Sequence, residues 1–63
     1  MTNLKAKRME RGYTQSELAK RAGVDIRIIQ HYEQGDRDIN KAQVVTVLKL
    51  ADALECSIRD ILN

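Results

Sequence analysis

The chain contains 63 residues, with 11 Lys and Arg, 9 Asp and Glu, one Cys, and neither Trp nor Phe. Its length fits one small domain over residues 1–63, and the single Cys excludes the secreted scaffolds that depend on internal disulfides. No apolar run approaches the roughly 20 residues that a membrane span needs, so we expect a soluble, cytoplasmic protein with an aliphatic core.

The first two predicted helices are delimited by a glycine and a capping motif. The first covers about residues 4–11 and ends at Gly12. Thr14 is a good N-cap, and Glu17, three residues later, completes a capping box. This pattern predicts a second helix over about residues 15–22, which starts directly after a tight turn.

The next two predicted helices are also preceded by cap-forming residues. Asp25 is a natural N-cap for a third helix over about residues 26–34, and Gly35 ends it. Asn40 is expected to cap a fourth and longer helix over about residues 41–54. The polar segment between them is predicted to be an exposed connection.

A short last helix is predicted over about residues 58–62, with Ser57 as its N-cap and Asp60 in its first turn. No segment alternates between apolar and polar residues for long enough to indicate a strand. The predicted fold class is therefore all-α, a compact five-helix bundle.

The second and third predicted helices are separated only by Gly23, Val24 and Asp25, which is typical of a helix-turn-helix. At about 100° per residue, and with Ile29 set toward the core, four polar side chains fall on the outward side of the third helix. They are Arg27, Gln30, His31 and Gln34. Arg and Gln can make bidentate contacts to guanine and adenine, so this side is a candidate surface for reading a major groove. The alternative is a solvated polar face, which any surface helix has.

Over residues 4–62 the sequence resembles the helix-turn-helix domain of phage repressor and Cro-like regulators, the Xre family. The resemblance rests on the joint spacing of several short motifs. They are Arg8, Gly12, Thr14-Gln15-Ser16-Glu17-Leu18-Ala19, Gly23-Val24, Ile29, Tyr32-Glu33, Gly35 and Leu50-Ala51-Asp52-Ala53-Leu54.

The resemblance implies a DNA-binding role for residues on and around the third helix. Gln15 matches a position that holds a phosphate and braces the recognition helix. Arg27, Gln30 and His31 match base-reading positions, and Gln34 shares their face. Arg37 and Lys41 match the region that contacts backbone phosphates. The resemblance also implies a structural ion pair between Arg8 and Glu33.

The sequence departs from the family pattern at three places. Ile39 stands where the family often has Pro, and the connection into the fourth helix is about three residues longer than in many relatives. Ile26 and Ile28 flank the outward face, where polar residues are common. Ile28 is predicted to pack on Tyr32, and contact with a thymine methyl group is the alternative.

The leading functional hypothesis is a sequence-specific DNA-binding regulator, most simply a repressor, whose partner is a double-stranded operator. Residues 1–35 carry seven basic and four acidic side chains, net +3, whereas residues 36–63 carry net −1. A basic half is typical of proteins that bind a polyanion. A homodimer is expected if the operator is two-fold symmetric. Its candidate contacts are Ile58, Ile61 and Leu62, and the alternative is that these residues close the core.

The alternative is a protein-interaction module on the same scaffold, such as an antitoxin or an adaptor, because fold does not fix function. An enzyme is not expected, since no nucleophile stands near the single His and the three glycines form no phosphate-binding loop. Nor does the sequence indicate a cofactor, a metal site or a small-molecule ligand. One Cys and one His cannot make a structural zinc site without carboxylate ligands.

Overall fold

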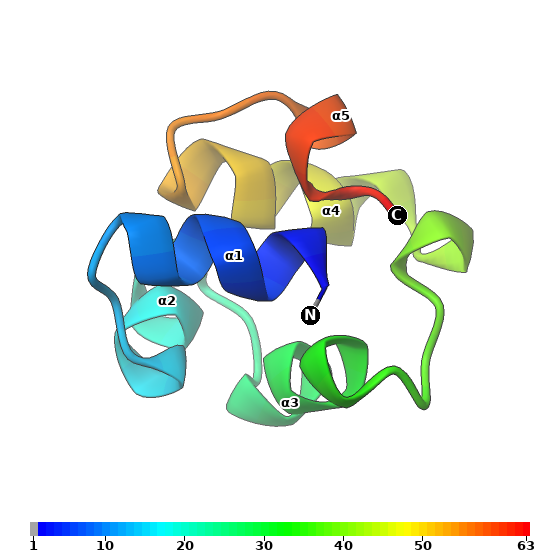
Figure 1. Cartoon of the computed structure of the whole chain (residues 1–63), viewed down its shortest axis with the longest axis horizontal. Coiled ribbons are helices and arrows are strands. Elements are labelled where there is room, and N and C mark those ends of the chain that lie inside the picture. The colour runs from blue at the N-terminus through cyan, green and yellow to red at the C-terminus, as the bar shows by residue number, and fades with distance from the viewer. Residues whose placement is uncertain (1) are drawn as a thin grey trace.

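The structure, a computed structural model, describes residues 2–63 and contains five α-helices and one short 3₁₀ helix. They are α1 (Asn3–Glu10), α2 (Gln15–Ala22), α3 (Ile26–Gln34), η1 (Ile39–Lys41), α4 (Val44–Ala53) and α5 (Ile58–Ile61). In the view of Figure 1, α1 crosses the middle of the molecule between the α4–α5 pair and the α2–α3 pair. Residues 2–63 form no strand, so the all-α five-helix prediction is confirmed.

Helices α2 and α3 begin where their predicted cap residues indicated. Thr14 Oγ1 accepts from the Glu17 N–H at 3.0 Å, and Glu17 Oε1 accepts from the Thr14 N–H at 3.0 Å. This reciprocal pair is the predicted capping box of α2. Asp25 Oδ1 accepts from the Arg27 N–H at 2.9 Å and caps α3. Both caps satisfy backbone donors that have no partner within their helices.

The predicted start of the fourth helix is wrong. Asn40 does not cap this helix but lies in η1, whose own cap is Asp38, with Oδ1 accepting from the Asn40 N–H at 2.9 Å. The N-cap of α4 is Gln43, which makes no side-chain capping bond. Ala42 is extended, with φ −70° and ψ 158°, and α4 begins only at Val44. The physical reason is the side chain of Ile39, which is 2% exposed and holds this segment against the core.

Asn40 has another role, because it joins the end of the chain to η1. Its Nδ2 donates to the Asn63 carbonyl at 2.6 Å, and its Oδ1 accepts from the Asn63 N–H at 2.9 Å. Asn3 Nδ2 donates to the Leu62 carbonyl at 2.6 Å. These bonds hold the last residues between the start of α1 and η1.

The core is entirely apolar and is formed by all five α-helices and η1. Its buried side chains are Leu4, Leu18, Ala19, Ala22, Ile29, Tyr32, Ile39, Val47, Leu50, Ala51, Leu54 and Ile61. Ile28 is half-buried against this cluster, and its packing on Tyr32 in particular stays a prediction. No helix within residues 2–63 combines the length and apolar content that crossing a membrane requires.

The end of α4 is held by a residue whose backbone has the left-handed conformation and by the arginine that follows α1. Glu55 has φ +54°, and the Cys56 N–H donates back to the Ala51 carbonyl at 3.0 Å. This is the bond pattern of a Schellman cap, in which glycine is usual at the left-handed position. Arg11 Nε donates to the Leu54 carbonyl at 2.8 Å, so the end of α1 also satisfies the end of α4.

Candidate nucleic-acid interface

The unit formed by α2, α3 and the turn between them is the candidate interface. Gly23 ends α2 with φ +69°, and its N–H and that of Val24 both donate to the Ala19 carbonyl, at 2.9 and 3.1 Å. A Cβ atom at Gly23 would meet nothing within 4 Å, so glycine is favoured there by the backbone conformation alone. Asp25 then starts α3 at once, which fixes the direction of α3 relative to α2.

One side of α3 anchors the helix and the other side is open. Ile29 and Tyr32 are buried in the core. The side chain of Arg27 is 80% exposed, and its only ion pair within residues 2–63 is a 3.9 Å contact from Nε to Asp25 Oδ1. The structure therefore leaves this guanidinium available for a ligand outside the domain.

The other predicted members of the outward face differ in exposure. Gln34 is exposed, whereas Gln30 and His31 are half-buried. All three lie on α3 away from the fully buried Ile29. The face is thus narrower than the helical rotation alone indicates, with Arg27 and Gln34 as its most exposed members.

A buried ion pair fixes α3 to α1. Arg8 Nε and Nη2 donate to the two carboxylate oxygens of Glu33, at 2.7 and 2.9 Å, and Arg8 Nη1 donates to the Tyr13 carbonyl at 2.7 Å. The side chains of Arg8 and Glu33 are only 12% and 4% exposed. The hydrogen bond to Glu33 raises the pKa of the Arg8 guanidinium above its ordinary value. The structure thus brings together the two residues for which the resemblance implies a structural pair.

Gln15, the first residue of α2, is also hydrogen-bonded to this ion pair. Its Nε2 donates to Glu33 Oε1 at 3.1 Å, so the side chain of Gln15 is held between α2 and α3. Gln15 also lies in the first turn of α2, where free backbone N–H groups and the helix dipole favour an anion. The position accordingly combines a contact to the recognition helix with an environment that suits a phosphate.

A contact at the end of α3 was not predicted from the sequence. His31 Nδ1 lies 2.9 Å from Asp36 Oδ2, because the chain reverses at Gly35, which has φ +86°. The hydrogen bond with His31 holds the pKa of the Asp36 carboxyl below its usual range. The signal that could have indicated this pair is a carboxylate next to the glycine that ends a helix, with a histidine in the last helical turn.

The two basic residues expected to contact phosphates follow α3 along the chain. Arg37 lies in the exposed loop after α3, and Lys41 ends η1. Lys41 was expected in the first turn of α4, so the revised start of that helix places it two residues before the α4 N-cap at Gln43. Both side chains are exposed.

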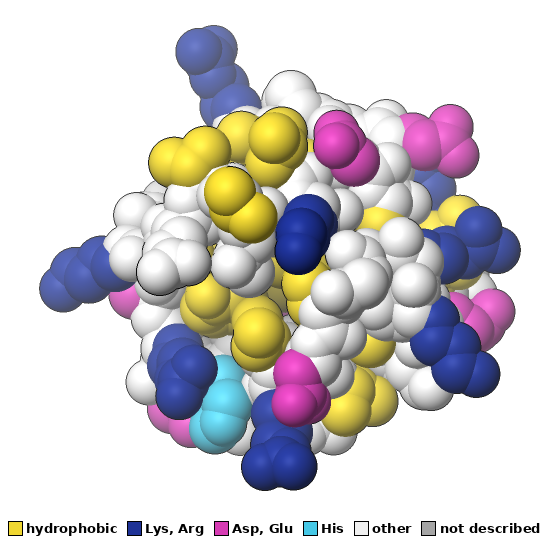
Figure 2. All heavy atoms as spheres, turned by 180° about the vertical axis from the view of Figure 1, so that it is seen from behind, with side chains coloured by type: hydrophobic (Ala, Val, Ile, Leu, Met, Phe, Trp, Pro, Cys, Tyr) yellow, Lys and Arg dark blue, Asp and Glu magenta, His cyan; other side chains and the backbone are white. Residues whose placement is uncertain are grey.

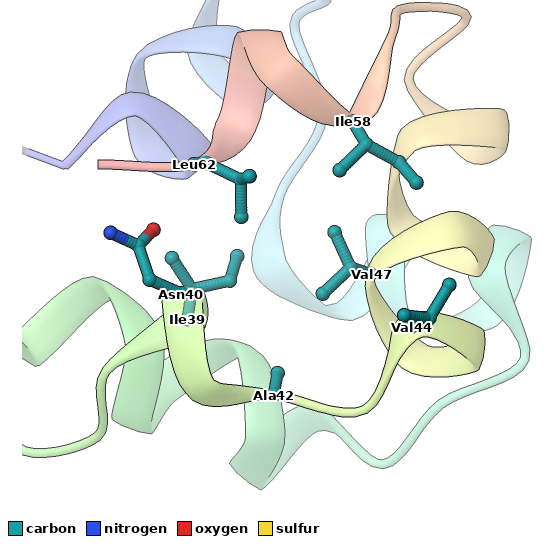
Figure 3. A pocket seen from close by; sticks show the side chains of 7 residues that line it. All are labelled: Ile39, Asn40, Ala42, Val44, Val47, Ile58 and Leu62. Atoms are coloured by element: carbon teal, nitrogen blue, oxygen red, sulfur yellow. The ribbon is translucent and has the colours of Figure 1, made fainter.

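A separate apolar patch lies on the surface and was missed in the sequence. Val44, Val45 and Leu48, all on α4, are 70%, 60% and 45% exposed, and we call them the α4 patch. Figure 2 shows hydrophobic side chains gathered on one face of the molecule, with charged side chains around its edge. A hollow of about 110 Å³ adjoins the patch. It is lined by Ile39, Asn40, Ala42, Val44, Val47, Ile58 and Leu62 (Figure 3).

The predicted dimer contacts fall in two different places. Ile58 and Leu62 are half-buried and line this hollow. Ile61 is fully buried in the core, so of the two roles considered for it, dimer contact and closing the core, the structure supports the second. A helix of one turn has too few residues for its apolar side to be identified from spacing.

Within residues 2–63 no three His, Cys, Asp or Glu side chains come together in a way that could hold a metal ion.

Comparisons with known proteins identify relatives of the same architecture. The helix-turn-helix family matches the chain over residues 4–61. The crystal structure of the restriction-modification controller protein C.AhdI from Aeromonas hydrophila is similar to this chain, with 32% sequence identity and a TM-score of 0.82. The similarity covers 95% of this chain and 86% of that chain. No curated protein sequence gives a significant match.

Proposed function

This chain belongs to the helix-turn-helix family, as its resemblance to the Xre regulators predicted, and is a DNA-binding transcription regulator; from that premise we propose that α3 enters the major groove of a specific duplex operator. The observation that carries the proposal is the exposed guanidinium of Arg27 on a helix whose opposite side is buried. Because the helix is rigidly anchored, fixing the arginine on a base edge orders its side chain without a further loss of backbone freedom. Arginine in a major groove most often binds guanine through O6 and N7.

We infer different roles for the residues around Arg27. Gln30 and His31 lie one helical turn further on, where they can read neighbouring base pairs. A second set would contact backbone phosphates and set the register of α3. It comprises Gln15, Gln34, Arg37 and Lys41. Arg8 and Glu33 stay inside the protein and hold α3 in place.

We infer that the regulator acts by occupying its operator near a promoter, most simply as a repressor. Binding alone is sufficient for this action, so no catalytic step is involved. The solved relative is a restriction-modification controller protein. Genes of a restriction-modification system are therefore reasonable first candidates when targets of this chain are sought.

We also infer that two copies bind together through the α4 patch. Two-fold symmetric operators are bound by dimers whose recognition helices lie about one turn of DNA apart. A two-fold contact is self-complementary, so one surface must offer both projecting and receiving parts. The α4 patch projects apolar side chains, and the adjoining hollow is lined mainly by apolar ones.

Selection of bound sequences from a random duplex pool tests the DNA-binding proposal. We expect an enriched motif whose binding weakens steeply with salt. Arg27→Ala should lower affinity for the selected site by about 5- to 150-fold and relax the preference at one base pair. Arg59→Ala, which removes an exposed arginine from α5, should leave that preference unchanged. No enriched motif, or equal behaviour of the two variants, would contradict the proposal.

Sedimentation of charged variants tests the dimer. Val45→Asp should convert the dimer to a monomer without changing the helical content. Met9→Asp is the matched control, because Met9 is also a large exposed apolar residue, 54% exposed, but lies on α1. A wild-type chain that stays monomeric at high concentration, with and without the selected duplex, would contradict the dimer. The α4 patch would then be a binding surface for a different protein.

A further inference from the structure

The contact between His31 and Asp36 places a carboxylate beside a side chain of the reading face. Both residues are partly or fully accessible to solvent, and the bond joins the last turn of α3 to the loop behind it. Within residues 2–63 no group is hydrogen-bonded to the other ring nitrogen, Nε2, of His31. The ring is therefore held at one nitrogen and free at the other.

The chemistry of the carboxylate decides which nitrogen carries the proton. An ionised carboxylate only accepts hydrogen bonds, so the 2.9 Å contact requires a proton on Nδ1. The depressed pKa of Asp36, due first to its bond with His31, keeps the carboxylate ionised at neutral pH. In the neutral ring the lone pair then lies on Nε2, which becomes an acceptor.

We propose that Asp36 is a specificity-determining positioning residue, which orients His31 and holds its proton on Nδ1 so that Nε2 faces the DNA as an acceptor. This inference rests on the proposed function. In the major groove the amino groups that an acceptor can bind are N6 of adenine and N4 of cytosine. Guanine and thymine offer only acceptors at the corresponding edge, so a neutral His31 in this state selects against them.

The structure offers a closely matched control for Asp36. Asp38 is also exposed, carries the same charge and lies in the same loop, but its side chain caps η1 instead of contacting His31. Asn is as good an N-cap as Asp, so Asp38→Asn removes one charge and keeps the cap. Asp36→Asn removes the same charge, and its amide can either accept from or donate to Nδ1, so neither ring form is favoured.

Nitrogen NMR of the histidine ring in the free protein gives the first readout. At a pH high enough to keep the ring neutral, we expect wild type and Asp38→Asn to be protonated on Nδ1, and Asp36→Asn to show a mixture of the two neutral forms. A ring protonated on Nε2 in wild type, or an unchanged ring in Asp36→Asn, would overturn the inference. A merely structural role of Asp36 would not move this signal.

Base preference on the selected duplex gives the second readout. Asp36→Asn should reduce the preference for adenine or cytosine by roughly three- to tenfold, at the same base pair where His31→Ala loses it. Asp38→Asn should keep the preference, although both variants gain some sequence-independent affinity from the lost negative charge. The His31→Ala, Asp36→Asn double variant should keep the same base preference as His31→Ala alone, because Asp36 acts only through His31.

The outcomes separate this inference from the proposed function. If Arg27→Ala loses the preference for its base pair but Asp36→Asn behaves like Asp38→Asn, the inference fails and the proposed function stands. If the wild-type chain selects no sequence, both fail.

Discussion

Replacing Glu33 with glutamine tests how the recognition helix is held. The side chain of Glu33 is 4% exposed and accepts from Arg8 twice and from Gln15 once. Glutamine has nearly the same size, but its amide N–H faces an arginine donor where an oxygen stood. After the change, the guanidinium of Arg8 keeps two acceptors, the remaining side-chain oxygen of residue 33 and the Tyr13 carbonyl.

The expected cost follows from the burial of the pair. Removing one partner of a buried ion pair typically costs about 3–5 kcal/mol. Because one acceptor of Glu33 and the Tyr13 carbonyl remain, we expect the lower end, about 3 kcal/mol. A domain of this length has a free energy of unfolding of about 3–9 kcal/mol in total. Glu33→Gln should accordingly lower the Tm by about 12–24 °C, at 4–8 °C per kcal/mol.

Thermal and urea unfolding followed by circular dichroism measure this effect. Glu10→Gln is the control, since Glu10 forms a 3.5 Å pair with Lys7 but is 65% exposed, and it should change stability by less than about 0.5 kcal/mol. Arg8→Met and the double variant complete a cycle, in which the double variant should lose less than the sum of the singles. A Glu33→Gln effect no larger than that of Glu10→Gln, or an additive cycle, would refute the reasoning.

Three further predictions concern the helix ends. Thr14→Ala removes the acceptor for the Glu17 N–H and should lower the free energy of unfolding by about 1 kcal/mol in urea denaturation. Glu55→Gly should raise it by about 0.5–1 kcal/mol, because Glu55 has φ +54°, whereas Glu55→Ala should not. Hydrogen bonds at the caps, from Thr14 and Ser57, hold the pKa of Glu17 and of Asp60 below their usual values. Their ionised forms therefore stabilise the fold above the unfolded-state pKa, and this stabilisation should begin to be lost as the pH falls below about 4.5 for Glu17 and about 3.8 for Asp60. Glu17→Gln should flatten part of that acid dependence of the Tm.

The sequence predicted best where a local interaction decides the structure. Helices α2 and α3 begin at Thr14 and Asp25 because each cap bonds a backbone N–H only two or three residues away. The start of α4 was predicted wrongly because its N-cap, Gln43, makes no side-chain capping bond that the sequence could have indicated. Asn40, the predicted cap, lies in η1 and bonds instead to Asn63, 23 positions away. Such tertiary contacts leave no periodic signal in the sequence.

The candidate site shows the same division between local and distant effects. Helical rotation placed Arg27 correctly on the open side of α3, because burial of Ile29 fixes the rotation of the helix. It did not indicate that Asp36 returns to His31, since the return depends on the left-handed Gly35 beyond the helix end. The α4 patch was missed although helical rotation indicates most of it. At about 100° per residue, Val45 and Leu48 fall on the side opposite the buried Leu50 wherever the helix starts, and both remain exposed.

Glu33 links the two kinds of contact that the proposed function requires. One of its oxygens, Oε1, accepts from Gln15, the proposed phosphate contact on α2, and from Arg8 on α1. Glu33 itself belongs to α3, the helix that carries the proposed base contacts. In the proposed complex, the distance between a phosphate at Gln15 and the base edges at α3 would therefore be set partly through one buried carboxylate. For this reason Glu33 variants that still fold should lose sequence preference as well as affinity, although the Glu33 side chain is only 4% exposed.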